Sequence, residues 1–234
     1  MAKYHDLVGE IDLFKPLSDR ERGIVASQCS WATYGPQIEI LGEGETSTDI
    51  FFVAGGEVSA KSYSASGREV TLNTIGRGRM FGEFSAVDGQ PRSASIVTLT
   101  DAVIARMTSQ AFREFLAAHP GVALLFAEHL VAKIRLLSHR VFEFSTLSAS
   151  NRIRAELLRM CGQRTSGCGT TISIDPAPSH YELATRLSTH REAVSRELSF
   201  LASRKVIELG RRRIRVLDLD RLMALAESQE VEKV

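Results

Sequence analysis

The glycines are unevenly distributed along this 234-residue chain, and their distribution limits the possible folds more than any other feature. Ten of the 17 glycines lie between positions 35 and 89. Among them, short β-prone runs alternate with turn residues, at 38–41, 49–53, 57–63 and 68–75. Residues 93–107 add two more expected strands, which meet at Thr100 and Asp101. Strands of this length and spacing predict an antiparallel roll or barrel. Short helices are expected before it, over residues 3–29, with Ser18 and Glu21 as a capping box.

After Pro120 and Gly121 the chain contains neither glycine nor proline until Gly162. Apolar residues recur there at alternating spacings of four and three: Ala123, Ala127, Leu130, Ile134, Leu137, Val141 and Phe144. This spacing predicts one helix over residues 122–147, about 39 Å long at 1.5 Å per residue. Its apolar seam favours pairing with a second copy of the chain. The alternative is a helix that packs on its own domain.

Residues 148–151 (Ser-Ala-Ser-Asn) interrupt the seam and predict a hinge that also offers N-caps for the next helix. Charge changes at the same point. Residues 1–148 hold 14 basic and 17 acidic residues, whereas residues 149–234 hold 15 basic and 11 acidic residues. The overall charge of +1 therefore conceals a basic C-terminal domain, which is the charge expected for contact with phosphate backbones.

The basic domain contains the pattern of a helix-turn-helix. Ser179 is the expected N-cap of a short helix that is buried through Leu183, Ala184 and Leu187. Ser188 and Thr189 end it, and a second helix is expected from about His190 to Ser203, buried through Val194, Leu198 and Leu201. Its exposed N-terminal end would carry Arg191, Glu192 and Arg196, residue types that hydrogen-bond guanine and cytosine edges in the major groove.

A small hairpin with a basic tip is expected after these helices, and its tip consists of Arg211, Arg212 and Arg213. A winged helix-turn-helix explains the helices and the hairpin together. The alternative, a solvated helix with an Arg/Glu face, is common in proteins but explains the charges alone.

A second motif, FGEFSAVDGQPRSA, lies at the end of the roll. Gly82 and Glu83 open a short helical segment, and Arg92 and Ser93 follow it. A helix start, an arginine and a serine hydroxyl together predict an anion pocket suited to a phosphodiester. Glu83 would repel that phosphate unless it faces a donor such as a ribose hydroxyl. Taken singly, Arg92 would more often be a surface ion-pair partner, and Glu83 a helix N-terminal acid.

The order of roll, FGE…PRSA, long helix and REAVSRE within a winged helix-turn-helix resembles the cyclic-AMP receptor protein (CRP/FNR) family of bacterial transcription regulators, over roughly residues 11–220. The resemblance implies an α+β fold with three parts. These are a cyclic-nucleotide-binding β-roll of the double-stranded β-helix or jelly-roll type (1–120), a long dimerisation helix with a hinge (121–148), and a winged helix-turn-helix DNA-binding domain (149–234).

The resemblance also implies roles for individual residues. Gly82 and Glu83 would hold the sugar 2′-hydroxyl, and Arg92 and Ser93 the cyclic phosphate, with Ala94 following as in the family pattern. Arg191, Glu192 and Arg196 would read an inverted repeat of TGTGA-like half-sites, assisted by Ser179, His190 and the wing arginines. The implied partners are a second copy of the chain, double-stranded DNA and RNA polymerase.

One position departs from the family pattern. Cyclic-AMP-responsive members usually place threonine and serine in the long helix to meet the adenine, and this chain has Leu137 and Ser138 there. Leucine cannot hydrogen-bond the exocyclic amine. We therefore expect cyclic AMP as the principal ligand, with looser purine selectivity that extends to cyclic GMP.

Other features argue against further classes of protein. No apolar run approaches the roughly 20 residues of a membrane helix, and no signal peptide is evident. The cysteines, Cys29, Cys161 and Cys168, form no CxxC pair, which is typical of a reduced cytoplasmic protein. Neither a metal site nor an iron–sulfur cluster is expected, because Cys29 stands alone near the N-terminus, and His129 and His139 are ten residues apart. No nucleophile with a base and no P-loop is visible, so an enzyme is not expected.

Two alternatives stay open beside a cyclic-nucleotide-dependent regulator. One is a member of the same family that responds to a different effector or to none. The other is a cyclic-nucleotide-binding module that acts by protein contact, against which the helix-turn-helix and the basic domain argue.

Overall fold

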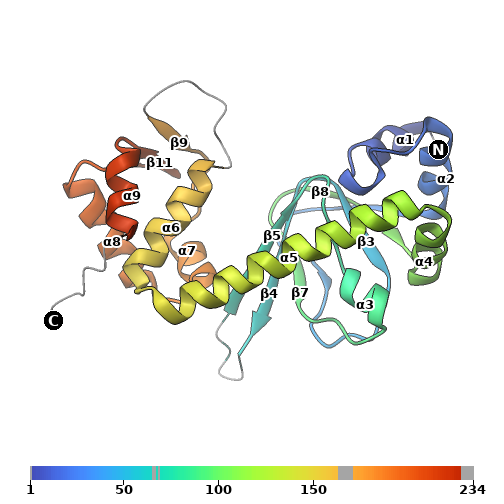
Figure 1. Cartoon of the computed structure of the whole chain (residues 1–234), viewed down its shortest axis with the longest axis horizontal. Helices are drawn as coiled ribbons and strands as arrows, with labels where there is room; N and C mark the ends of the chain where they lie inside the picture. Colours follow the sequence, from blue (N-terminus) through green and yellow to red (C-terminus); the bar gives the residue numbers. More distant parts are fainter. Residues whose placement is uncertain (1, 65–66, 68, 163–170, 228–234) are drawn as a thin grey trace. The chain divides into compact units, whose positions relative to one another are not determined.

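A computed structural model describes residues 2–64, 67, 69–162 and 171–227 (Figure 1), so Cys168 lies outside the described residues. The chain divides into two compact units, Met1–Ile134 and Arg135–Val234. No single described helix is long and apolar enough to cross a membrane. The helices Ser109–Ala118 and Pro120–Thr146 would meet that requirement only as a pair, and they are bent by 117°.

The first unit contains the predicted roll, built from two four-stranded antiparallel sheets among the described residues. One sheet has the order β1-β8-β3-β6 (Ser30–Tyr34, Ala102–Met107, Ile50–Gly55, Met80–Phe81). The other has the order β2-β7-β4-β5 (Glu39–Leu41, Ser95–Thr98, Glu57–Tyr63, Glu69–Gly76). The strands predicted from the β-prone runs are confirmed. β1 and β6 were not predicted, because the apolar residues of β1 (Trp31, Ala32 and Tyr34) do not alternate regularly with polar ones and β6 has only two residues.

Strand β3 is apolar along most of its length because both of its faces are buried. Phe51 and Val53 face the opposite sheet and pack with residues such as Val58 and Ile96. Ile50 and Phe52 face the other way, toward a helical layer. β8 alternates in the same way, with Ala105 and Met107 in one cluster and Ala102 and Ile104 in the other, so this sheet lies between the two apolar clusters of the unit.

The helical layer consists of α1 (Ala2–Gly9), the 3-10 turn η1 (Asp12–Phe14), α2 (Asp19–Gln28), α4 (Ser109–Ala118) and the start of α5 (Pro120–Thr146). Figure 1 shows α1, α2 and α4 lying together. The capping box of α2 is confirmed, since the Ser18 hydroxyl accepts from the Glu21 amide and the Glu21 carboxylate accepts from the Ser18 amide. Buried phenylalanines fill this layer, among them Phe14, Phe112 and Phe115.

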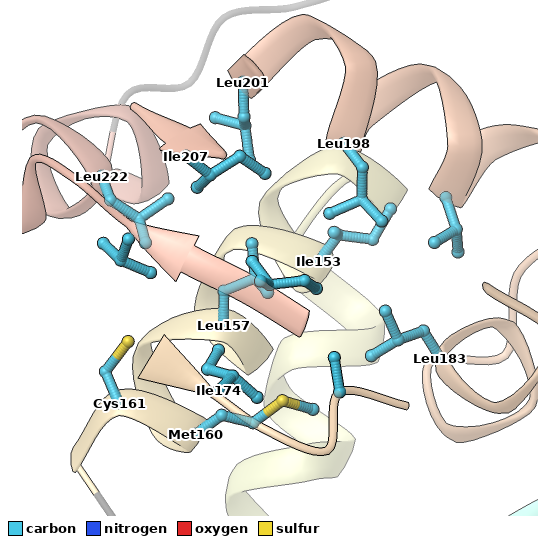
Figure 2. Packing of buried hydrophobic residues seen from close by; sticks show 14 of the residues in the cluster. Ile153, Leu157, Met160, Cys161, Ile174, Leu183, Leu198, Leu201, Ile207 and Leu222 are labelled. Carbon is cyan, nitrogen blue, oxygen red and sulfur yellow. The ribbon is translucent and has the colours of Figure 1, made fainter. Parts of the chain in front are cut away.

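The second unit contains the winged helix-turn-helix. Its elements after α5 are α6 (Ala149–Gly162), β9 (Ile172–Ile174), α7 (His180–Arg186), α8 (Arg191–Ser203), β10 (Ile207–Gly210), β11 (Arg213–Val216) and α9 (Leu219–Glu227). Figure 2 shows Ile153 and Leu157 of α6 at the centre of its core, with Leu183 and Leu198 pointing toward them. The predicted wing is confirmed as β10 and β11, and β9 adds a third strand that we did not predict.

The predicted interruption at residues 148–151 is wrong in extent. Only Leu147 and Ser148 lie outside the helices, because α6 already begins at Ala149. The Ser148 hydroxyl accepts from the Asn151 amide at 3.2 Å, and this cap lets residues 149–151 form the first helical turn. Arg152 bridges the break, donating from Nη1 to the Leu147 carbonyl at 2.9 Å, with its guanidinium carbon 5.4 Å from the centre of the Phe144 ring.

Candidate functional site

The motif at the end of the roll forms a compact polar site in the first unit. Gly82 is the single residue between β6 and α3 (Glu83–Asp88), and it is the N-cap of α3, with a φ of +77°. A Cβ atom at this position would lie 2.7 Å from Arg92 Nη1 and 3.0 Å from the Asp49 carbonyl oxygen. The glycine is therefore required both by the left-handed backbone and by the closeness of the arginine.

Arg92 is the centre of the site and is only 3% exposed. Its guanidinium donates from Nε to Ser47 Oγ (3.0 Å), from Nη1 to the Gly82 carbonyl (3.1 Å) and from Nη2 to the Asp49 carbonyl (2.8 Å). Burial lowers the pKa of Arg92, and the nearby carboxylates of Asp49 and Glu45 oppose that shift. A guanidinium has five N–H donors, so these bonds leave two for an anion.

The loop before β3 is held against the same arginine. The Arg92 amide donates to the Glu45 carbonyl (2.8 Å), and the Gly44 amide donates to the Arg92 carbonyl (2.9 Å). Next along the chain, Ser93 is exposed and Ala94 is half-buried. Hydrogen bonds to its side chain and to its backbone thus hold Arg92 in place, whereas Ser93 is exposed to solvent.

Glu83, beside Arg92 in the motif, is 2% exposed and forms an ion pair with Lys133 Nζ of α5. The same ammonium lies 4.5 Å from the centre of the Phe84 ring. Burial lowers the pKa of the neighbouring His129; Glu83 opposes this shift and Lys133 adds to it. The site therefore combines a buried cation on the roll with a carboxylate held by a cation on the long helix.

The structure brings together Gly82, Glu83 and Arg92 of the predicted motif, and it adds Ser47, Asp49 and Lys133, which were not predicted. Lys133 lies four residues before Leu137, on the same face of the helix, so helical periodicity could have identified it. Ser47 and Asp49 come from a distant loop that carries no comparable signal. Leu137 and Ser138 belong to the second unit, where both side chains are exposed.

The helix-turn-helix of the second unit follows the predicted pattern. Ser179 caps α7 in a capping box with Glu182, and Ser188, with a φ of +48°, makes the turn. Helix α8 follows with His190 as its N-cap residue. Arg191, Glu192 and Arg196 are exposed, whereas Val194, Leu198 and Leu201 are fully buried.

The wing presents its arginines from a two-residue hairpin turn. Arg211 and Arg212 are exposed, and the Arg212 carbonyl accepts from the Ala177 amide at 2.7 Å, which fixes the turn. Arg213 is also exposed but donates to the Asp175 carboxylate at 2.8 Å. Arg211 and Arg212 are thus the wing arginines for which the described residues show no acidic partner. A metal-ligand group of three or more His, Cys, Asp or Glu residues is also not found among the described residues.

A roll with a buried arginine and carboxylate, joined in one chain to a winged helix-turn-helix, is the architecture of a ligand-responsive transcription regulator. A family model for the cyclic nucleotide-binding domain matches residues 31–119, and one for the Crp-like helix-turn-helix domain matches residues 151–225. The "Cyclic AMP receptor protein" of Thermus thermophilus is 31% identical over 198 residues, covering 85% of this chain and 88% of that protein.

Two further proteins are similar to this chain. A "CRP-like cAMP-activated global transcriptional regulator" of Mycobacterium tuberculosis is 25% identical, over 78% of this chain and 82% of that protein. The structure of a CooA mutant from Carboxydothermus hydrogenoformans has the same fold, with a TM-score of 0.81 and 18% identity, over 93% of this chain and 96% of that one. The chain belongs to the cyclic AMP receptor protein (CRP/FNR) family of transcription regulators.

Proposed function

We propose that this chain is a sequence-specific DNA-binding transcription regulator whose DNA affinity depends on a cyclic nucleotide, principally cyclic AMP. One observation carries the proposal: a guanidinium that is 3% exposed keeps two N–H donors beside a buried carboxylate on the same roll. A cyclic nucleotide offers both the anion and the sugar hydroxyl that this pair requires. Arg92 and Ser93 would bind the cyclic phosphate, and Glu83 the 2′-hydroxyl.

The long helix supplies the proposed dimer. Several apolar side chains of the seam on α5 are exposed in the single chain, among them Ile134 (61%), Leu137 (46%) and Val141 (65%). Exposed apolar surface at heptad spacing is stabilised by pairing with an identical helix. Ligand bound in each roll would shift the equilibrium between two arrangements of the paired helices, to the extent that it binds them differently.

The DNA-binding half of the proposal rests on the exposed end of α8. Arg191, Glu192 and Arg196 would contact base edges of TGTGA-like half-sites, while Arg211, Arg212 and Arg213 would add phosphate contacts. The two recognition helices of a dimer would lie about 34 Å apart, one DNA turn, on an inverted repeat. Contact with RNA polymerase and a cytoplasmic location are part of the same proposal.

The purine selectivity belongs to the same proposal. Leu137 offers no hydrogen bond to the purine, so cyclic GMP should also bind. Isothermal titration with both nucleotides tests this directly. A preference for cyclic AMP of a hundredfold or more, about 2.7 kcal/mol, would contradict the looser selectivity.

A second candidate is a family member that binds its operator without any nucleotide. The observation in its favour is that Arg92 and Glu83 already have protein partners, in Ser47, Asp49, Gly82 and Lys133. The variant Arg92→Leu separates the two candidates. Loss of nucleotide-dependent DNA binding supports the proposed function, and DNA binding equal to that of the wild type, with or without nucleotide, supports the second candidate.

A further inference from the structure

The core of the DNA-binding unit contains one ion pair that is almost completely buried. Arg154 of α6 donates from Nε to Glu197 Oε1 of α8 at 2.6 Å, and each side chain is 6% exposed. Arg154 also donates from Nη1 to Asn151 Oδ1 at 3.1 Å and to the Leu225 carbonyl of α9 at 2.8 Å. One guanidinium therefore connects three helices, and it lies 5.7 Å from the centre of the Phe200 ring of α8.

This pair is a poor candidate for a purely stabilising contact. The cost of removing two charges from water can exceed their mutual attraction, so a well-packed apolar pair of similar volume is often equally stable. Buried apolar residues already hold α8 on α6 and α9, among them Ile153, Leu198 and Leu222. What apolar packing lacks is direction, because burial of apolar surface is non-directional, whereas a charged hydrogen bond has a defined geometry.

Glu197 directly follows Arg196, the proposed base-reading residue, on the same helix. Rotation of α8 by about 15° would move a group about 6 Å from the helix axis by roughly 1.5 Å. A positioned binding group tolerates only about 0.5 Å. A bond that prevents such a rotation would therefore affect which bases Arg196 contacts more than it affects the stability of the fold.

We infer that Arg154 is a positioning residue for sequence recognition, one that fixes the rotation of α8 through Glu197 and ties it to α6 and α9. The inference rests on the proposed function. It gives a buried side chain, which cannot touch DNA, a role in distinguishing one DNA sequence from another.

The test uses the full chain with saturating cyclic AMP, a palindromic TGTGA-type duplex and the same duplex with one base pair changed in each half-site. The ratio of the two affinities, measured by fluorescence anisotropy at fixed salt, is the discrimination. The double variant R154M/E197M should lose at least tenfold in discrimination while its urea unfolding midpoint stays equal or rises. Discrimination within threefold of the wild-type value overturns the inference.

A matched control is the ion pair Lys61–Glu69 in the roll, at 3.1 Å with side chains 16% and 18% exposed. The variant K61M/E69M should keep the full discrimination. If R154M/E197M does not fold, R154K tests the same claim. Its single ammonium can replace either Nε at Glu197 or Nη1 at Asn151 and Leu225, but not both, so its discrimination should fall at least threefold, and an unchanged value overturns the inference.

The same experiment separates this inference from the proposed function. A wild-type chain that prefers no palindromic duplex overturns the proposed function, and the inference with it. A wild-type chain that discriminates, alongside an R154M/E197M variant that discriminates equally well, overturns the inference alone.

Discussion

Replacement of Gly82 by alanine would perturb the proposed nucleotide site through a single methyl group. The new Cβ would lie 2.7 Å from Arg92 Nη1 and 3.0 Å from the Asp49 carbonyl oxygen. The carbonyl belongs to the backbone beside β3 and cannot move easily. Arg92 must therefore give way, and it loses the 3.1 Å bond to the Gly82 carbonyl that orients it.

Two separate effects follow, and their sizes differ. The left-handed backbone at position 82 (φ +77°) should cost about 1–2 kcal/mol of stability once a Cβ is present. Displacement of the guanidinium should weaken a charged hydrogen bond to the nucleotide, worth about 1.5–3 kcal/mol. The dissociation constant for cyclic AMP should then rise about 10- to 150-fold.

Gly89 supplies a matched control at the other end of α3. Its φ is +72°, but a Cβ there would meet nothing within 4 Å. Gly89→Ala should therefore lose a similar amount of stability while its affinity for cyclic AMP stays within twofold of the wild-type value. Urea unfolding measures the first quantity, and isothermal titration the second. Equal nucleotide affinities for the two variants would refute the reasoning, because the contact with Arg92 would then have no effect.

Three further predictions concern other parts of the chain. Lys133→Ala leaves the Glu83 carboxylate, 2% exposed, without its ammonium, and should cost about 1–3 kcal/mol in urea unfolding; a change below about 0.5 kcal/mol would contradict the role given to this pair. Arg196→Ala should cost about 1–3 kcal/mol on the specific duplex and relax selectivity there, whereas a uniform loss across all sequences would make Arg196 a phosphate contact. Burial raises the pKa of Cys29 to about 12, so native Cys29 should react with iodoacetamide at pH 8 at least about 100-fold more slowly than in the unfolded chain, as followed by mass spectrometry. The folded state then retains a proton that the unfolded state loses above about pH 9, so stability should fall as the pH rises beyond that value, and a flat profile would contradict the raised pKa.

Local patterns were sufficient to predict much of this fold. The run at 57–63 predicts β4, and Ser18 with Glu21 predicts the N-terminus of α2, because strand alternation and helix capping depend on neighbouring residues. β1 escaped prediction because the apolar residues of Ser30–Tyr34 do not alternate regularly with polar ones, and only pairing with β8 makes them a strand. The break between α5 and α6 lies before the predicted position because a hydroxyl cap at Ser148 outweighs the low helix propensity of Ser150 and Asn151.

The candidate site could be predicted from the sequence only where its residues are close together in the chain. Gly82, Glu83 and Arg92 lie within eleven residues of one another, so one motif identifies them. Ser47 and Asp49 are more than 40 residues away and reach Arg92 only because the strands of the roll bring them there. The Arg154–Glu197 pair was not predicted for a related reason, since burial of a charge depends on three helices meeting at one point.

The central claim is that a nucleotide held by Arg92 controls DNA binding. Operator affinity of the full chain, measured with and without saturating cyclic AMP or cyclic GMP on one palindromic duplex, tests that claim most directly. We expect the affinity to rise at least tenfold with cyclic AMP in the wild type and to stay unchanged in Arg92→Leu. A wild-type affinity that neither nucleotide alters would contradict the account.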